Sequence, residues 1–140
     1  MALGSMNHLA LVASDFARSC EFYDHVLKFM GYERVEMPEH VRTLMKTPVA
    51  AWASPNCSIT LRPAKSIGAK PYDRYAPGLN HFAFNAERRD DVDRFGQLLE
   101  AIGATVLDPP AEYPYAPGYY AVYCADPDGI KMEFVYWPRS

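Results

Sequence analysis

Two segments of this 140-residue chain, 73 positions apart, repeat one another. Residues 7–13 (NHLALVA) and 80–86 (NHFAFNA) are identical at four of seven positions and apolar in both copies at two more. In each half a stripe of apolar residues at helical spacing follows and ends at a glycine, Gly31 or Gly103. Self-similarity at a fixed offset indicates one supersecondary unit used twice. The chain is therefore expected to fold as a duplicated module.

Each copy predicts the order strand, helix and three further strands. The expected elements of the first half are a strand at 7–13, a helix at 15–30 and strands at 32–38, 43–53 and 57–63. In the second half, a helix over residues 92–102 follows the strand at 80–86, and strands are expected at 104–107, 118–125 and 130–136. The Pro-rich tract 109–118 is expected to be an ordered loop. The predicted fold class is α+β, with two tandem βαβββ modules.

A chain of this length is expected to form one domain. We place module one at 7–63, a linker rich in Gly and Pro at 64–79, and module two at 80–137, so that 7–140 is a single domain. Residues 1–6 (MALGSM) are interpreted as an expression leader or a disordered N-terminus.

Composition narrows the class of partner and the compartment. The net charge of −3, with 14 Lys and Arg against 17 Asp and Glu, argues against a nucleic-acid partner. No apolar run approaches the ~18 residues of a membrane span. The cysteines Cys20, Cys57 and Cys124 are odd in number and lack CxxC spacing, which predicts free thiols and a cytoplasmic protein.

The 73-residue offset relates four positions in two pairs, and three of these positions hold a histidine or a carboxylate. His8 and His81 are related by the offset, and Glu133 in the last strand is related to Thr60. Glu133 alternates with Met132 and Phe134, so it lies on the opposite face of its strand. Two imidazoles and a carboxylate suit Fe(II), Mn, Ni or Zn and leave coordination positions open. The pattern predicts a divalent metal site at His8, His81 and Glu133, and a structural polar cluster is the alternative interpretation.

Five further residues are candidates for binding substrate or for lining its pocket. Arg62 lies two residues beyond Thr60 on the same strand face, so both are candidates to contact substrate, and its guanidinium suits a carboxylate. Trp52 and the loop tyrosines Tyr113 and Tyr115 are candidates for a pocket wall, with core or surface packing as the alternative for each.

These motifs resemble the vicinal oxygen chelate (VOC) superfamily, which includes glyoxalase I, bleomycin-resistance and fosfomycin-resistance proteins, and extradiol dioxygenases. The residues that carry the resemblance are 7–12 (NHLALV), 19–23 (SCEFY), 78–84 (GLNHFAF) and 126–134 (DPDGIKMEF). The resemblance implies an open barrel of paired βαβββ modules around a metal held by His8, His81 and Glu133.

The resemblance implies three possible functions. The first is a metal-dependent, glyoxalase-like enzyme of the lyase or isomerase type, acting on a small substrate that chelates the metal through vicinal oxygens. The second is a small extradiol-type Fe(II) dioxygenase. The third is a metal-free, small-molecule-binding protein of the resistance type. We favour the first, with Glu133 and Tyr123 as catalytic residues and Zn, Ni, Mn or Fe(II) as the metal.

Departures from the family pattern argue against the glyoxalase I reaction and against fosfomycin transfer. Thr60 stands where glyoxalase I has a fourth ligand, and Val12 stands where it has a glutathione-binding arginine. Ala10 replaces a threonine of the fosfomycin-resistance proteins. Tyr123, ten residues before Glu133, matches a tyrosine found in extradiol dioxygenases and fosfomycin-resistance proteins alike.

The resemblance also implies a homodimer in which module one of one chain and module two of its partner complete a site, with closure within one chain as the alternative.

Overall fold

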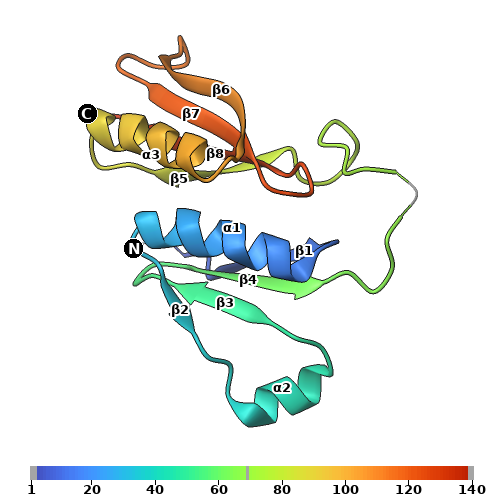
Figure 1. The fold of residues 1–140 in the computed structure, drawn as a ribbon. Coiled ribbons are helices and arrows are strands. Elements are labelled where there is room, and N and C mark those ends of the chain that lie inside the picture. Colours follow the sequence, from blue (N-terminus) through green and yellow to red (C-terminus); the bar gives the residue numbers. More distant parts are fainter. Residues whose placement is uncertain (1–2, 69, 139–140) are drawn as a thin grey trace. The chain divides into compact units, whose positions relative to one another are not determined.

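The computed structural model describes residues 3–68 and 70–138, and the chain divides after Gly68 into two compact units (Figure 1). Unit 1, up to Gly68, contains six elements in chain order: β1 (His8–Ala13), α1 (Phe16–Phe29), β2 (Glu33–Val35), α2 (Glu39–Met45), β3 (Ala50–Ala53) and β4 (Ser58–Pro63). Unit 2 contains five: β5 (His81–Asn85), α3 (Arg89–Ala101), β6 (Thr105–Glu112), β7 (Tyr120–Ala125) and β8 (Lys131–Tyr136).

The two units share one sheet topology, which confirms the duplicated module. Unit 1 has the strand order β1-β4-β3-β2 and unit 2 has β5-β8-β7-β6. In each unit the first strand pairs in parallel with the last, with His8 opposite Ser58 and His81 opposite Lys131. These pairs are both related by the 73-residue offset. The α+β fold class is thus confirmed, and each sheet is open and four-stranded.

One face of each sheet is covered by a helix of its own unit, α1 in unit 1 and α3 in unit 2. Helix α1 buries Phe22, Tyr23, Val26 and Leu27, and the Tyr23 ring lies 6.0 Å from the ring of Trp52 in β3. In unit 2 the Phe95 ring of α3 lies 4.9 Å from the ring of Phe134 in β8. Both helices are thus held by the apolar stripes that predicted them. Neither α1 nor α3 covers the opposite face of its sheet.

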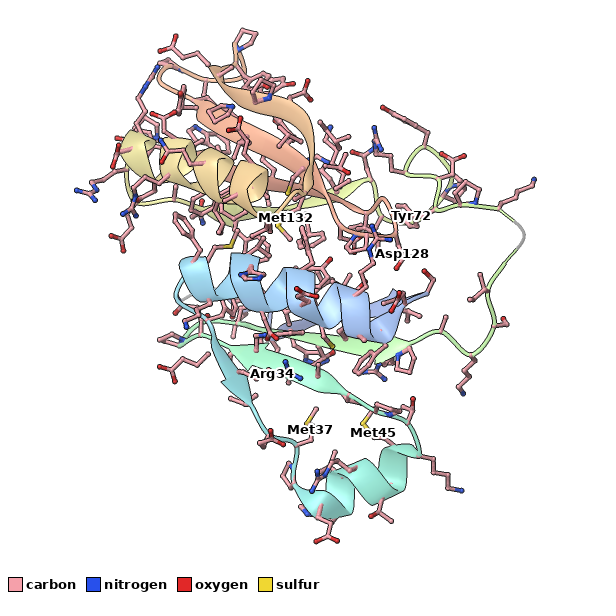
Figure 2. The ribbon with its side chains drawn as sticks, in the orientation of Figure 1. Arg34, Met37, Met45, Tyr72, Asp128 and Met132 are labelled. Carbon is pink, nitrogen blue, oxygen red and sulfur yellow. The ribbon has the colours of Figure 1, made fainter. Side chains whose placement is uncertain are left out.

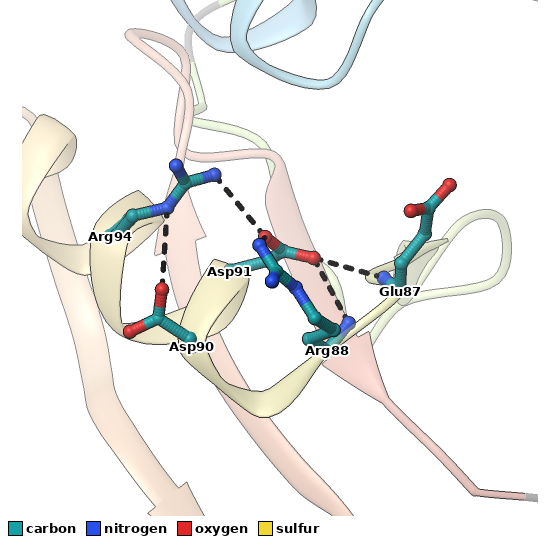
Figure 3. A network of polar contacts seen from close by, with 5 residues as sticks. All are labelled: Glu87, Arg88, Asp90, Asp91 and Arg94. Atoms are coloured by element: carbon teal, nitrogen blue, oxygen red, sulfur yellow. Dashed lines mark hydrogen bonds and ion pairs between the residues drawn. The ribbon is translucent and has the colours of Figure 1, made fainter.

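Local signals in the sequence set the ends of both helices. Asp15 precedes α1 and accepts a hydrogen bond from the backbone N–H of Arg18, as an N-cap does. At the start of α3, Asp91 accepts from the backbone N–H groups of Glu87 and Arg88, and Arg94 forms ion pairs with Asp90 and Asp91 (Figure 3). Gly31 and Gly103 follow the two helices with φ of 91° and 70°, a conformation that glycine adopts without strain.

The expected strands 32–38 and 43–53 are wrong in part, because a helix separates two shorter strands. Helix α2 begins after Pro38 and ends at Met45, where Lys46 adopts a left-handed conformation with φ of 55°. Val41, Leu44 and Met45 have helical spacing, and Glu39 lies in the first turn. In Figure 2, Met37 and Met45 lie on the side of α2 that faces the sheet. The first module is therefore β-α-β-α-β-β.

The Pro-rich tract is also not wholly a loop, because β6 extends through Pro109 and Pro110 to Glu112. This strand lies at the edge of its sheet, and its pairing with β7 has register shifts on both sides of Asp108. Proline lacks a donor for a ladder, but edge strands and bulges tolerate it. The loop was expected because proline disfavours a central strand, but β6 is an edge strand, where proline is tolerated.

Of the leader expected at 1–6, residues 1 and 2 lie outside the described residues, and residues 3–6 are exposed. Within 3–68 and 70–138, no helix has the length and apolar character needed to cross a membrane.

Candidate functional site

The helix-free face of the unit 2 sheet carries a cluster of polar and aromatic side chains. Glu133 in β8 is paired with Ala83 in β5 and with Tyr123 in β7, so neighbours from three strands meet at one place. Alternation sends Met132 and Phe134 to the helix side and leaves Glu133 on this face. The carboxylate is 2% exposed, which is unusual for Glu unless it has partners.

His81 is one partner of Glu133. Its Nε2 lies 3.2 Å from Oε1 of Glu133, and its Nδ1 lies 2.7 Å from the side-chain oxygen of Asn80. Because the amide oxygen can only accept, Nδ1 carries a proton. Nε2 and the carboxylate oxygen then face one another, so a proton on Nε2 or a cation bound by both atoms holds them together.

Two tyrosines hold the other oxygen of Glu133. Tyr119 and Tyr123 both donate hydrogen bonds to Oε2, the second at 3.1 Å. Burial is the main cause that raises the pKa of both hydroxyls, and the negative charge of Glu133 raises these pKa values further. Both groups therefore stay protonated and continue to donate well above neutral pH.

A cavity of about 390 Å³ lies over this cluster, within the size range of small-molecule sites. The Tyr113 and Tyr115 rings are stacked 5.7 Å apart, and each makes an edge contact with one of the tyrosines that bind Glu133. The lining residues are Asn80, His81, Asp108, Tyr113, Tyr115, Tyr119, Tyr123, Lys131 and Glu133. The loop tyrosines thus form part of a pocket wall.

The equivalent face of unit 1 carries three of the other predicted site residues, His8, Thr60 and Arg62. His8, Ala10 and Val12 alternate along β1, and Ala10 and Val12 pair with Thr60 and Arg62 of β4. Nδ1 of His8 lies 2.8 Å from the side-chain oxygen of Asn7, the same contact that His81 makes with Asn80. Oγ1 of Thr60 and Nε of Arg62 are buried without a hydrogen-bond partner among the described residues.

Trp52 lies on the other face of the unit 1 sheet from Thr60 and Arg62. It pairs with Ile59, is 1% exposed, and donates from Nε1 to Asp24 of α1 at 2.8 Å. The structure therefore brings Thr60 and Arg62 to one face and places Trp52 in the core beneath α1.

The structure thus brings His81, Glu133 and Tyr123 together in unit 2, and places His8, Thr60 and Arg62 on one sheet face in unit 1. Within the described part of each unit, no group of three or more His, Cys, Asp and Glu side chains is gathered for a metal ion. Each unit by itself supplies part of the predicted ligand set.

Sequence reasoning assigned no role to Asn80, Tyr119, Lys131 or Asp108. Alternation could have found Tyr119, because it precedes Ala121 and Tyr123 at two-residue spacing on the same face. The repeated Asn-His pair likewise marked Asn80. Asp108 had no such signal, because the bulges of β6 shift its register.

The family model of the "Glyoxalase/Bleomycin resistance protein/Dioxygenase superfamily" matches residues 5–134. The chain belongs to this superfamily. It is 35% identical over 133 residues to the uncharacterized protein YqjT of Bacillus subtilis (strain 168), covering 93% of this chain and 97% of that protein.

Two solved structures of the superfamily share the fold of this member. A domain described as glyoxylase/bleomycin resistance protein/dioxygenase from Frankia sp. EAN1pec has a TM-score of 0.79 at 25% identity, covering 99% of this chain and 96% of that one. A candidate glyoxalase from Bacillus halodurans has a TM-score of 0.79 at 26% identity, with 96% and 97% covered.

Proposed function

We propose that this superfamily member is a metal-dependent, glyoxalase-like enzyme of the lyase or isomerase type. Its substrate is a small molecule that binds the metal through two adjacent oxygens. The observation that carries the proposal is the buried Glu133 carboxylate, 3.2 Å from Nε2 of His81 at a cavity of small-molecule size.

His8, His81 and Glu133 are the proposed ligands of a divalent metal, which is Zn, Ni, Mn or Fe(II). The donor set fits, because an imidazole nitrogen and a carboxylate oxygen already face each other and a cation would satisfy both lone pairs. The paired Asn-His contacts of the two units support His8 as the equivalent second imidazole. A bound metal would supply Lewis-acid catalysis to the substrate oxygens.

The chain's own residues then orient the carboxylate and the substrate. Tyr119 and Tyr123 hold one oxygen of Glu133 and leave Oε1 toward His81. Tyr123, whose raised pKa keeps its hydroxyl protonated, is the proposed catalytic hydrogen-bond donor beside the carboxylate. Arg62 and Thr60, which have unpartnered buried polar atoms among the described residues, are proposed to bind substrate. Trp52 has no role in this proposal, because it packs under α1.

One observation favours an extradiol-type Fe(II) dioxygenase as a second candidate. Tyr123 donates to Glu133 at 3.1 Å within a pocket lined by four tyrosines, a surface that suits an aromatic substrate. The metal that the protein contains as purified, before any metal is added, separates the two candidates. Fe supports the dioxygenase, and Zn, Ni or Mn supports the lyase or isomerase.

Metal analysis tests the proposal directly. Purified protein is loaded with each divalent metal, dialysed and assayed for bound metal, with Fe(II) handled without oxygen. We expect about one equivalent per chain, as three dedicated ligands with open positions hold one ion. The double substitution His8→Ala with His81→Ala should lose it.

The matched control is His25→Ala with His40→Ala, because both of these histidines are exposed on helices. That variant should keep its metal. Full metal retention in the His8 and His81 double variant would refute the ligand assignment. Absence of metal from the wild type would favour a metal-free binding protein.

We further propose that the protein is a cytoplasmic homodimer. Each module exposes one sheet face that its own helix leaves free, and that face carries His8 in unit 1 and His81 in unit 2. A second module must cover it to close a site. All three cysteines are free, which supports a reducing compartment.

A further inference from the structure

Lys131 of β8 presents a cation to the unit 2 cavity. It lies two residues before Glu133 and opposite His81 of β5, so it shares their sheet face. The residue is partly buried and belongs to the lining of the cavity. Among the described residues its ammonium group has no hydrogen-bond or ion-pair partner, and its contact is with the ring of Tyr123. The cation is therefore available to a ligand.

The ring of Tyr123 holds this ammonium group in a defined place. The hydroxyl of Tyr123 donates to Glu133 at 3.1 Å, so the ring is fixed at one end. Nζ of Lys131 lies 4.6 Å from the centroid of that ring, a position in which a cation is attracted to the ring face. An ammonium group has three donors, and the ring covers one side of it, so donors remain for a ligand.

Two carboxylates share the cavity, but within the described part of unit 2 neither forms an ion pair with Lys131. Glu133 already has hydrogen-bond partners on both oxygens. Asp108 is exposed on the edge strand β6, where water screens its charge. It pairs with Tyr123 of β7, which pairs with Glu133, so Asp108 lies two strands from β8, roughly 10 Å away. Lys131 is thus the partly buried charge that still lacks a polar partner.

Stacked tyrosine rings form a preformed wall of the same cavity. Tyr113 and Tyr115 lie parallel, and the loop that carries them is closed by backbone hydrogen bonds from Tyr113 to Tyr119 and from Tyr119 to Ala116. Flat aromatic surfaces of this kind favour a planar ring as a ligand. The volume of about 390 Å³ accepts a compound of one or two rings. The cavity therefore suits a planar, apolar body that carries one anionic group.

We infer that Lys131 is a specificity-determining residue, which binds a carboxylate of a small aromatic substrate whose ring packs against Tyr113 and Tyr115. This inference rests on the proposed function, because it names the substrate class of the same site. A charge-assisted hydrogen bond between ammonium and carboxylate is stronger than a neutral one. Ser58 stands at the repeat position of Lys131, opposite His8, so recognition of the anion belongs to the second module alone.

Binding of two matched probes to the full-length, metal-free protein tests the inference without a metal to hold either probe. The probes are 2-naphthoate and its neutral amide, 2-naphthamide, which share ring and size, and NMR titration gives the dissociation constants. We expect the wild type to prefer 2-naphthoate. Lys131→Met keeps an apolar stem against Tyr123 and removes the charge. It should weaken 2-naphthoate binding by about tenfold and leave 2-naphthamide unchanged.

Three further variants separate the charge from the shape of the cavity. Lys131→Gln should behave as Lys131→Met does, and it replaces that variant if the latter does not fold. Asp108→Asn is the matched control from the same cavity and should not weaken 2-naphthoate binding. Tyr115→Ala should weaken both probes alike, because Tyr115 is 68% exposed and its ring is a wall of the cavity rather than part of the core.

Equal loss of both probes in Lys131→Met, or an unchanged affinity for 2-naphthoate, would overturn the role of Lys131. A wild type that binds neither probe, or binds both equally, would overturn the substrate class. If 2-naphthoate is preferred as expected but the protein binds none of the four metals, the proposed function fails while the assignment of Lys131 is supported. The two failures are therefore distinct.

Discussion

The buried carboxylate of Glu133 is stabilised by hydrogen-bond partners on both of its oxygens. A carboxylate has about four acceptor positions, and burial without partners would be costly. Tyr119 and Tyr123 donate to one oxygen and His81 faces the other. Because burial and the nearby carboxylate raise the pKa of both tyrosines, their protons remain available to it. At its repeat position, Thr60 has no such partners among the described residues.

Thr60 is the position at which a fourth ligand can be tested. Thr60→Glu places a carboxylate at the repeat equivalent of Glu133. We therefore expect it to tighten metal binding by about tenfold, or about 1.4 kcal/mol. It should also shift the preference toward Zn or Ni. Competition titration with a chromogenic chelator measures both.

Thr60→Val is the control, because it keeps the shape of the side chain without a donor atom and should leave metal affinity unchanged. Equal affinities in the Glu and Val variants would show that β4 does not present this residue to the metal.

At the scale of elements, strong periodicity made some segments predictable. Helix α1 and strands β1, β4, β5 and β8 lie within one residue of their expected bounds, and α3 begins three residues before its expected start. The same alternation correctly separated Glu133 from Met132 and Phe134. The Glu133 and His81 half of the site was therefore accessible from sequence.

Other elements depend on tertiary context that a sequence pattern does not carry. Strand β2 has only three residues, too few for an alternation signal. Strand β6 contains two prolines and is possible only because it lies at an edge. Trp52 was a candidate for a pocket wall or for core packing, and its contacts with Tyr23 and Asp24 of α1 place it in the core. These contacts link segments about thirty residues apart.

The close packing of α3 on β6 can be tested by a substitution at Gly96. A Cβ added at Gly96 would lie 2.8 Å from Cγ of Pro110, so the helix approaches the strand closely at this point. Gly→Ala in a helix normally stabilises by about 1 kcal/mol. Here overpacking costs roughly 1–3 kcal/mol, so we expect Gly96→Ala to lower the free energy of unfolding by about 1 kcal/mol.

Urea denaturation measures the change, and the double variant with Pro110→Ala provides the matched comparison. Removing the proline ring should recover most of the loss that Gly96→Ala causes. Additive effects of the two substitutions would argue against the contact.

At the scale of the whole molecule, the proposed homodimer predicts that each metal site is shared between two chains. If His8 of one chain acts with His81 and Glu133 of its partner, mixing His8→Ala chains with Glu133→Ala chains creates one intact site per mixed dimer. With free exchange, half of the dimers are mixed, so metal content should recover to roughly a quarter of the wild-type value.

His8→Ala chains exchanged among themselves serve as the control and should bind no metal. If differently tagged subunits exchange and the mixture still binds none, each chain builds its own site.

The parallel pairing of the first and last strand in each module also bears on folding. Among the described strands, β1 pairs with β4 alone, so the ladder that holds His8 cannot form until the chain has been synthesised through Pro63. Strand β5 likewise waits for β8, at the end of its module. Pairings between distant segments form slowly, because loop closure costs entropy before the contact is made. We therefore expect each histidine to reach its place after the helix and hairpin of its own module have formed.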